Sequence, residues 1–174
     1  MKTKTLVALA LLAAIGTVLH AVVPNFIFGM KPDLSLIMMF IGILLFPERK
    51  NVLLIGVVTG FISALTTGFP GGQIPNIIDK PLTAFAFYFL YLALKNFDKP
   101  LVRAGILTAV GTIISGTVFL TSALLIVGLP GGASFTFFFL TVVLPACAMN
   151  TVLMVVIYPI ITSIAKRSNL SVAL

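Results

Sequence analysis

The sequence predicts an all-α integral membrane protein, and three observations support that prediction. Apolar residues make up 60% of the 174-residue chain. Only 9% of the residues are charged, whereas a soluble domain carries about 25%. The apolar residues lie in long runs that short clusters of charge, proline and glycine separate. Such a chain cannot cover its own surface with polar groups, which excludes a water-soluble domain, a disordered tail and a collagen-like fibre.

Six apolar runs are predicted to be the helices of one transmembrane domain, residues 1–174. They are Thr5–Val23, Leu34–Phe46, Val52–Phe69, Pro81–Leu94, Ala104–Val127 and Phe135–Ala165. At about 1.5 Å per residue, the first, third and fifth reach roughly 28, 27 and 36 Å, close to or above the hydrocarbon thickness of about 30 Å. The second and fourth reach only about 20 Å. Each of these two must therefore extend into a neighbouring loop or end inside the protein.

The positions of lysine and arginine predict that both termini are cytoplasmic. With the N-terminus inside, nine of the eleven cations border the cytoplasm, and only Lys31 and Lys80 lie outside, as the positive-inside rule requires. The net charge of +7 is then explained by cations that lie beside the cytoplasmic surface of the lipid bilayer. No nucleic acid partner is therefore expected. The first segment begins as a signal peptide does, but no clear small-residue cleavage site precedes the next polar loop, so we expect it to be retained.

Two short polar stretches are the strongest candidates for a ligand site. Lys31 and Asp33 precede the second predicted helix, and Asp79 and Lys80 precede the fourth. Short spans beside polar groups are typical of transport sites, because irregular backbone at membrane depth is tolerated only where it lines a cavity. Two cations and two anions suit a zwitterionic ligand such as an amino acid. The alternative is that each stretch forms an ion pair at the water boundary, worth about 0–1 kcal/mol.

The stretch before Pro81 is compatible with two structures. One is a helix that begins near Pro75, in which four side chains form a single polar stripe: Asn76, Asp79, Lys80 and Thr83. Pro81 argues against that helix, because its ring removes a backbone hydrogen bond and restricts the residue before it. The other structure is a loop from Gln73 to Lys80 folded over the site. Either one places these residues in the outer half of the membrane.

Other side chains inside the predicted spans are candidates for contact with the ligand. Asn150 must hydrogen-bond another helix or the ligand, because hydrocarbon cannot satisfy its amide. Aromatic side chains near the outer ends of the fourth and sixth helices either anchor in lipid or line a pocket for an aromatic ligand: Phe85, Phe87, Tyr88, Phe135, Phe137, Phe138 and Phe139.

The residue sets of an enzyme or a metal site are missing from the sequence. The single histidine, His20, and the single cysteine, Cys147, cannot form a metal cluster or an intrachain disulfide. No nucleophile with a base and no closely spaced carboxylates are present. We therefore expect neither catalysis nor a cofactor. The chain also lacks a phosphate-binding loop of the G-x-x-x-x-G-K-[ST] type, so it cannot itself hydrolyse ATP.

Five stretches resemble the small bacterial tryptophan transporter family called TrpP, and together they extend over nearly the whole chain. They are GMKPD at 29–33, LLFP at 44–47, SALTT at 63–67, QIPNIIDKP at 73–81 and IVGLPGG at 126–132. The stretch at 73–81 is the most specific of them. The family is similar in size and six-helix layout to the substrate-binding S components of energy-coupling-factor transporters. The resemblance thus implies an S-component-like bundle.

What the resemblance implies about function is high-affinity tryptophan uptake across a bacterial plasma membrane by a multi-pass protein. The ligand would bind in the outer half, among Lys31, Asp33, Gln73, Asn76, Asp79, Lys80 and Asn150. Ala10 and Ala14 match the spacing by which S components dock on the transmembrane subunit of the energy-coupling factor, whose ATPases would energise uptake. The alternatives are a solitary ion-coupled carrier and a protein for another aromatic or vitamin-like ligand. An ion-coupled carrier needs a carboxylate within a span, and the predicted spans contain none, which favours the ATPase partner.

Overall fold

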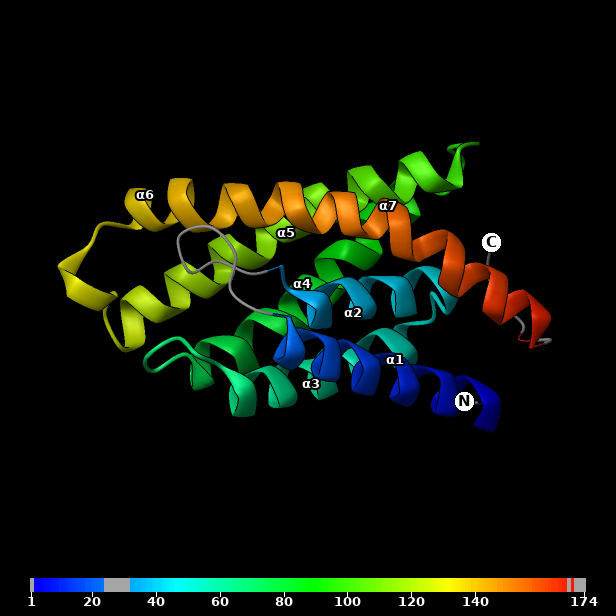
Figure 1. Ribbon diagram of the computed structural model, residues 1–174, viewed down its shortest axis with the longest axis horizontal. Coiled ribbons are helices and arrows are strands. Elements are labelled where there is room, and N and C mark those ends of the chain that lie inside the picture. Colours follow the sequence, from blue (N-terminus) through cyan, green and yellow to red (C-terminus); the bar gives the residue numbers. More distant parts are fainter. Residues whose placement is uncertain (1, 24–31, 169, 171–174) are drawn as a thin grey trace.

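The computed structural model describes residues 2–23, 32–168 and 170, which form one bundle of helices (Figure 1). The helices are α1 (Thr3–Val22), α2 (Leu34–Leu45), α3 (Arg49–Thr66), α4 (Gln73–Ala93), α5 (Pro100–Ile126), α6 (Phe135–Phe138) and α7 (Leu144–Arg167). A 3-10 turn, η2 (Pro130–Gly132), precedes α6, and a π-helical turn, η3 (Phe139–Val143), joins α6 to α7. No strand occurs among the described residues. The predicted all-α class is confirmed.

Four helical segments are long and apolar enough to cross a membrane: α1, α3, α5 and the continuous run Phe135–Arg167. Their outward faces expose many large apolar side chains, as expected where the surrounding solvent is lipid. Helix α4 has 21 residues, a length of about 31 Å, but its first half carries Asp79 and Lys80. The protein is therefore a helical integral membrane bundle.

The predicted start of the fourth helix was wrong. Helix α4 begins at Gln73, includes Pro81 and is not short. Pro81 removes one backbone hydrogen bond, yet α3 packs so closely here that a β-carbon on Gly56 would lie 3.2 Å from the Pro81 Cα. Tertiary packing thus stabilises a helix that the local sequence disfavours. Of the two structures open for this stretch, the helix that begins near Pro75 is the correct one.

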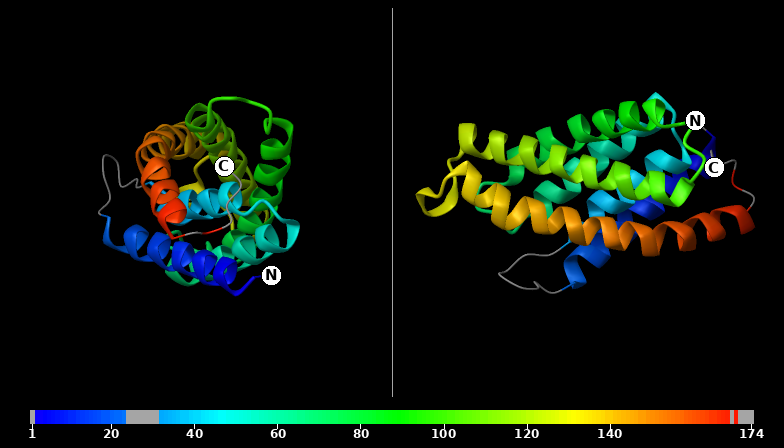
Figure 2. Two further views of the ribbon diagram at one scale, coloured as in Figure 1. Left: turned by 90° about the vertical axis from the view of Figure 1, so that its right-hand side faces the viewer. Right: turned by 90° about the horizontal axis from the view of Figure 1, so that it is seen from above.

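Helix α2 is short, as predicted, and lies at the centre of the bundle (Figure 2). All 12 of its residues are buried, and it packs against α1, α3, α4, α5 and α7. A helix that is apolar on every side is stable only when it is surrounded in this way. Because its length is about 18 Å, it cannot reach both faces of a membrane. Its first turn, with the capping residue Asp33, therefore lies inside the bundle.

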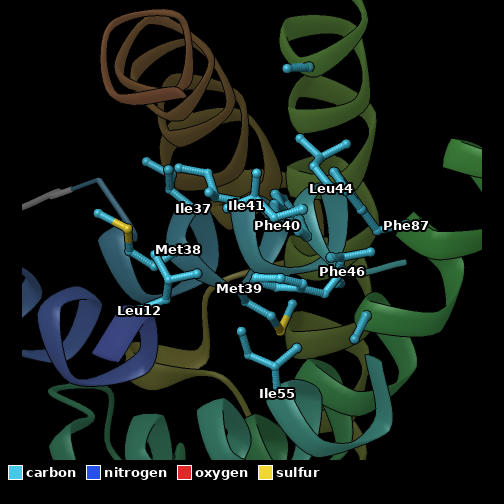
Figure 3. Close-up of a cluster of buried hydrophobic side chains, with 14 of the residues drawn as sticks. Leu12, Ile37, Met38, Met39, Phe40, Ile41, Leu44, Phe46, Ile55 and Phe87 are labelled. Carbon is cyan, nitrogen blue, oxygen red and sulfur yellow. The ribbon is translucent and has the colours of Figure 1, made fainter. Parts of the chain in front are cut away.

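The main hydrophobic core surrounds this central helix (Figure 3). Phe40 of α2 and Phe87 of α4 stack with ring centroids 4.0 Å apart and planes 7° from parallel. Gly111 of α5 faces both rings: a β-carbon there would lie 2.7 Å from Phe40 Cζ and 2.9 Å from Phe87 Cδ2. Phe87 is thus a core residue. It lies 14 residues into α4 and not near the outer end, where the sequence analysis expected it.

The turns divide between the two ends of the bundle (Figures 1 and 2). The first and last described residues lie at the same end as the α2–α3 and α4–α5 connections. The α3–α4 and α5–α6 connections lie at the opposite end. This arrangement fits the predicted topology, in which both termini are on one side of the membrane.

We expect the end that holds the termini to face the cytoplasm, because most of the cations lie there. Lys50, in the first turn of α3, and Ser134, before α6, are both exposed and lie at opposite ends. In a background carrying Cys147→Ala, a thiol reagent that cannot cross membranes should label Ser134→Cys in intact cells and leave Lys50→Cys unlabelled until the cells are opened. The reverse labelling pattern would contradict this orientation.

Candidate functional site

A cavity of about 650 Å³ lies at the end of the bundle opposite the termini. Its polar lining comes from α1, the start of α2, the end of α3, the first half of α4, α5 and α7. Its apolar lining comes mainly from the α3–α4 turn, α5 and the segment from α6 to η3. Ligand pockets typically have volumes of about 300–1,000 Å³ and combine an apolar wall with a few polar groups. The cavity is therefore the candidate ligand site.

Three charged side chains form an ionic cluster in the cavity wall. Lys80 Nζ lies 2.9 Å from Asp33 Oδ2 and 2.9 Å from Asp79 Oδ2. It also donates to Ser115 Oγ at 3.4 Å. An ammonium group has three donors, so each N–H of Lys80 has an acceptor. Burying charges is tolerable only with such pairing.

Asp79 is enclosed on all sides. Thr83 Oγ1 donates to its Oδ1 at 2.7 Å, and Ser115 Oγ donates to its Oδ2 at 2.8 Å. The Asp79 side chain is fully buried. These two hydroxyl groups, together with Lys80, hold the carboxylate against α5 and leave none of it exposed.

Asp33 joins the ionic cluster to the central helix. Its Oδ1 accepts a hydrogen bond from Leu36 N at 2.9 Å and so caps α2. His20 Nδ1 lies 3.8 Å from the same oxygen. The Asp33 side chain is 28% exposed, compared with 4% for Lys80 and 0% for Asp79. Asp33 is therefore the charged member of the cluster that is most open to the cavity.

Asn150 of α7 connects three helices. Its Oδ1 accepts from Asp33 N at 3.0 Å, and its Nδ2 donates to Thr112 Oγ1 at 3.3 Å. The side chain is fully buried and lines the cavity. The amide thus finds partners on α2 and α5, in line with the expectation that it bonds another helix.

The polar stripe of α4 explains how these groups come together. Asn76, Asp79, Lys80 and Thr83 are all buried on one face of the helix. Gly60 of α3 faces this stripe, and a β-carbon there would lie 3.3 Å from Asn76 O and 3.5 Å from Lys80 Cβ. The missing side chain at Gly60 allows α3 to approach closely. The stripe also contacts the start of α2 through Lys80 and α5 through Asp79.

The other candidate residues have different positions. Asn76 lines the cavity, and its Nδ2 donates to Gly72 O at 2.8 Å. Gln73, the first residue of α4, is exposed and does not line the cavity. Lys31 lies outside the described residues. Ala10 and Ala14 lie on the exposed face of α1, away from the cavity.

Three phenylalanine rings form an aromatic wall at the cavity. Phe69 makes edge-on contacts with Phe119 at a centroid distance of 5.2 Å and with Phe138 at 6.1 Å, and all three line the cavity. Of the aromatic residues proposed from the sequence, only Phe138 is among the lining residues. Phe69 and Phe119 were missed because they are isolated in the sequence. Ser115 was missed as well, although it lies between Gly111 and Gly116 on a face of small residues.

We predict that Lys80→Met destabilises the fold, because it leaves two buried carboxylates without their counter-ion. Removing one partner of a buried ion pair costs about 3–5 kcal/mol. Thermal unfolding of the detergent-purified protein should show a clearly lower midpoint for Lys80→Met and little change for Lys50→Met, which removes an exposed lysine. Equal midpoints for the two variants would contradict the role of Lys80 as counter-ion.

Comparison with known proteins identifies the family to which the chain belongs. The family model described as "Tryptophan transporter TrpP" matches residues 2–166. A "Probable tryptophan transport protein" of Bacillus subtilis (strain 168) is 61% identical over 169 residues, which cover 97% of this chain and 96% of that protein. Proteins with the same description from Clostridium acetobutylicum and Clostridium perfringens are 47% identical over 158 residues and 41% identical over 178 residues. They cover 91% and 97% of this chain, and 91% and 96% of their own lengths. No solved structure matches the chain significantly. The chain belongs to the TrpP family of tryptophan transporters.

Proposed function

We propose that this protein captures L-tryptophan from outside the cell and serves as the substrate-binding component of an uptake system in the bacterial plasma membrane. The observation that carries the proposal is the cavity itself, in which an aromatic wall faces a buried ionic cluster. Tryptophan has the matching chemistry, because an apolar ring and a charged amino-acid group are joined by a short linker. The relatives' description as probable tryptophan transport proteins supports the same ligand.

The aromatic wall accounts for the choice of a large ring. Burial of 150–250 Å² of ring surface at about 25 cal/mol per Å² contributes roughly 4–6 kcal/mol before the cost of association. Edge-on contacts between the indole and the rings of Phe69 and Phe119 would add about 0.5–1.5 kcal/mol each. A ligand without a ring, such as alanine, would lose all of this stabilisation.

We propose that uptake is energised by a partner ATPase module of the energy-coupling-factor type. The chain has no phosphate-binding loop for ATP. Ala10 and Ala14 are exposed one turn apart on α1, and small residues at this spacing let a neighbouring helix approach closely. This face of α1 is therefore available for docking on a transmembrane subunit.

A solitary ion-coupled carrier is the second candidate, and one structural finding favours it. The predicted spans contain no carboxylate, but helix α4 begins at Gln73 and so includes Asp79, which is fully buried. Buried carboxylates at membrane depth are typical of ion and proton pathways. The two candidates differ in whether this chain transports tryptophan without a partner.

Binding can be measured through the ligand's own fluorescence, because the chain contains no tryptophan and only three tyrosines. We expect the emission of tryptophan to shift to shorter wavelength as the indole leaves water for the cavity. Phe119→Ala should weaken binding about tenfold, since it removes part of the aromatic wall. Phe61→Ala should bind like the unaltered protein, because Phe61 is 55% exposed and does not line the cavity.

Two results would contradict a tryptophan pocket at this cavity. One is unchanged binding to Phe119→Ala. The other is displacement of tryptophan by alanine at concentrations similar to those needed for tryptophan itself.

Docking through α1 predicts that transport and binding respond differently to one variant. We expect the double change Ala10→Leu with Ala14→Leu to abolish uptake in cells while tryptophan binding to the purified protein stays intact, because larger side chains hold a partner helix away. Ala21→Leu, also exposed on α1, is the matched control and should keep both properties.

The result against the partner would be undiminished uptake in the double variant. Tryptophan accumulation in proteoliposomes that hold only this chain and an ion gradient would likewise favour the solitary carrier.

A further inference from the structure

The charged groups at the cavity do not balance. Among the described residues that line it, two carboxylates, Asp33 and Asp79, face one ammonium group, Lys80. With the imidazole of His20, which also lines the cavity and lies 3.8 Å from Asp33 Oδ1, counted as neutral, their formal charges sum to −1. Isolated net charge in a buried, low-dielectric site is costly, so the cluster favours a ligand that brings a positive group.

The ammonium group of Lys80 has no donor to spare for a ligand carboxylate. Its three N–H groups are directed at Asp33, Asp79 and Ser115, and the side chain is only 4% exposed. A carboxylate that approached Lys80 would have to displace one of these acceptors. It would also add a second excess negative charge to the cluster.

The carboxylate of Asp33 does have unused capacity. It accepts one hydrogen bond from Leu36 N and one from Lys80 Nζ, whereas a carboxylate has about four acceptor sites. His20 Nδ1 approaches Oδ1 only to 3.8 Å. With 28% of its side chain open, Asp33 is the charged group of the cluster that can meet a ligand directly. Asp79, fully buried, cannot.

We infer that this site recognises its ligand by the ammonium group, which binds the open side of the Asp33 carboxylate, and that the ligand's carboxylate is dispensable. The substrate class is thus aromatic primary amines, of which tryptophan is one member. This inference rests on the proposed function for the aromatic part of the ligand. In this arrangement Asp79 and Ser115 are positioning residues, because they orient Lys80 and thereby fix the unused side of Asp33.

Three indole compounds test the amine and the carboxylate of the ligand separately. Tryptophan carries both charged groups, tryptamine only the amine, and indole-3-propionate only the carboxylate. Each is titrated directly into the unaltered, detergent-purified protein and followed by calorimetry, at a pH of about 8, where an imidazole is usually neutral and a primary amine is charged. We expect tryptamine to bind within about fivefold of tryptophan, and indole-3-propionate to bind about ten- to hundredfold more weakly.

The variant Asp33→Asn tests the same contact from the protein side. Asparagine caps a helix as well as aspartate does, and Asp79 remains as a partner for Lys80. Tryptamine binding should fall about ten- to hundredfold, while indole-3-propionate binding falls little or improves. Glu48→Gln, which removes an exposed carboxylate at the other end of the bundle, is the control and should leave both affinities unchanged.

The outcomes distinguish this inference from the proposed function. Recognition by the ammonium group alone is wrong if tryptophan binds and indole-3-propionate binds at least as tightly as tryptamine. It is also wrong if tryptophan binds and neither of the other two compounds does. If tryptamine binds and tryptophan does not, the inference holds and the proposed function fails. If none of the three compounds binds, both fail. The ligand series needs no variant, so misfolding of Asp33→Asn does not affect this conclusion.

Discussion

The contact of one ammonium group with two carboxylates inside the bundle is the interaction on which the rest of the structure depends. Lys80 reaches Asp33 at the start of α2 and Asp79 on its own helix, both at 2.9 Å. Because buried charges must be paired, these contacts fix where α2 begins and how α4 is rotated. They also explain why α4 continues through Pro81: its first turns carry the residues that neutralise the capping carboxylate of the central helix.

The two sides of this cluster have different roles. Toward the end of the bundle opposite the termini it adjoins the cavity and the aromatic wall of Phe69, Phe119 and Phe138. Seven residues further along α4, about 10 Å, the stacked rings of Phe40 and Phe87 pack against Gly111 and close the bundle. From that end inward, the bundle thus presents an apolar wall, a charged surface and then a closed core. This order suits capture of an amphipathic solute from one side.

The fold class could be predicted from the sequence, because long apolar runs with few charges leave a helical bundle in lipid as the one stable solution. The short length of α2 was also predicted correctly, because the polar residues on both sides of it mark where the helix begins and ends. The start of α4 was not predictable, because Pro81 disfavours helix locally and the compensating packing of Gly56 comes from another helix. For the site, Lys31 with Asp33 and Asp79 with Lys80 looked like two local pairs. The ion pair between Asp33 and Lys80, which are 47 residues apart, depends on the tertiary structure.

The most direct test of whether paired buried charges stabilise this bundle is the thermal unfolding of a variant in which a second substitution compensates for the first. Lys80→Met alone leaves two unpaired carboxylates, whereas Lys80→Met combined with Asp79→Asn leaves one. The account predicts that the double variant unfolds at a higher temperature than Lys80→Met, although it carries one more substitution, because the second change removes an uncompensated buried charge. A double variant that unfolds at the same temperature as Lys80→Met, or lower, would contradict the central place given to the ionic cluster.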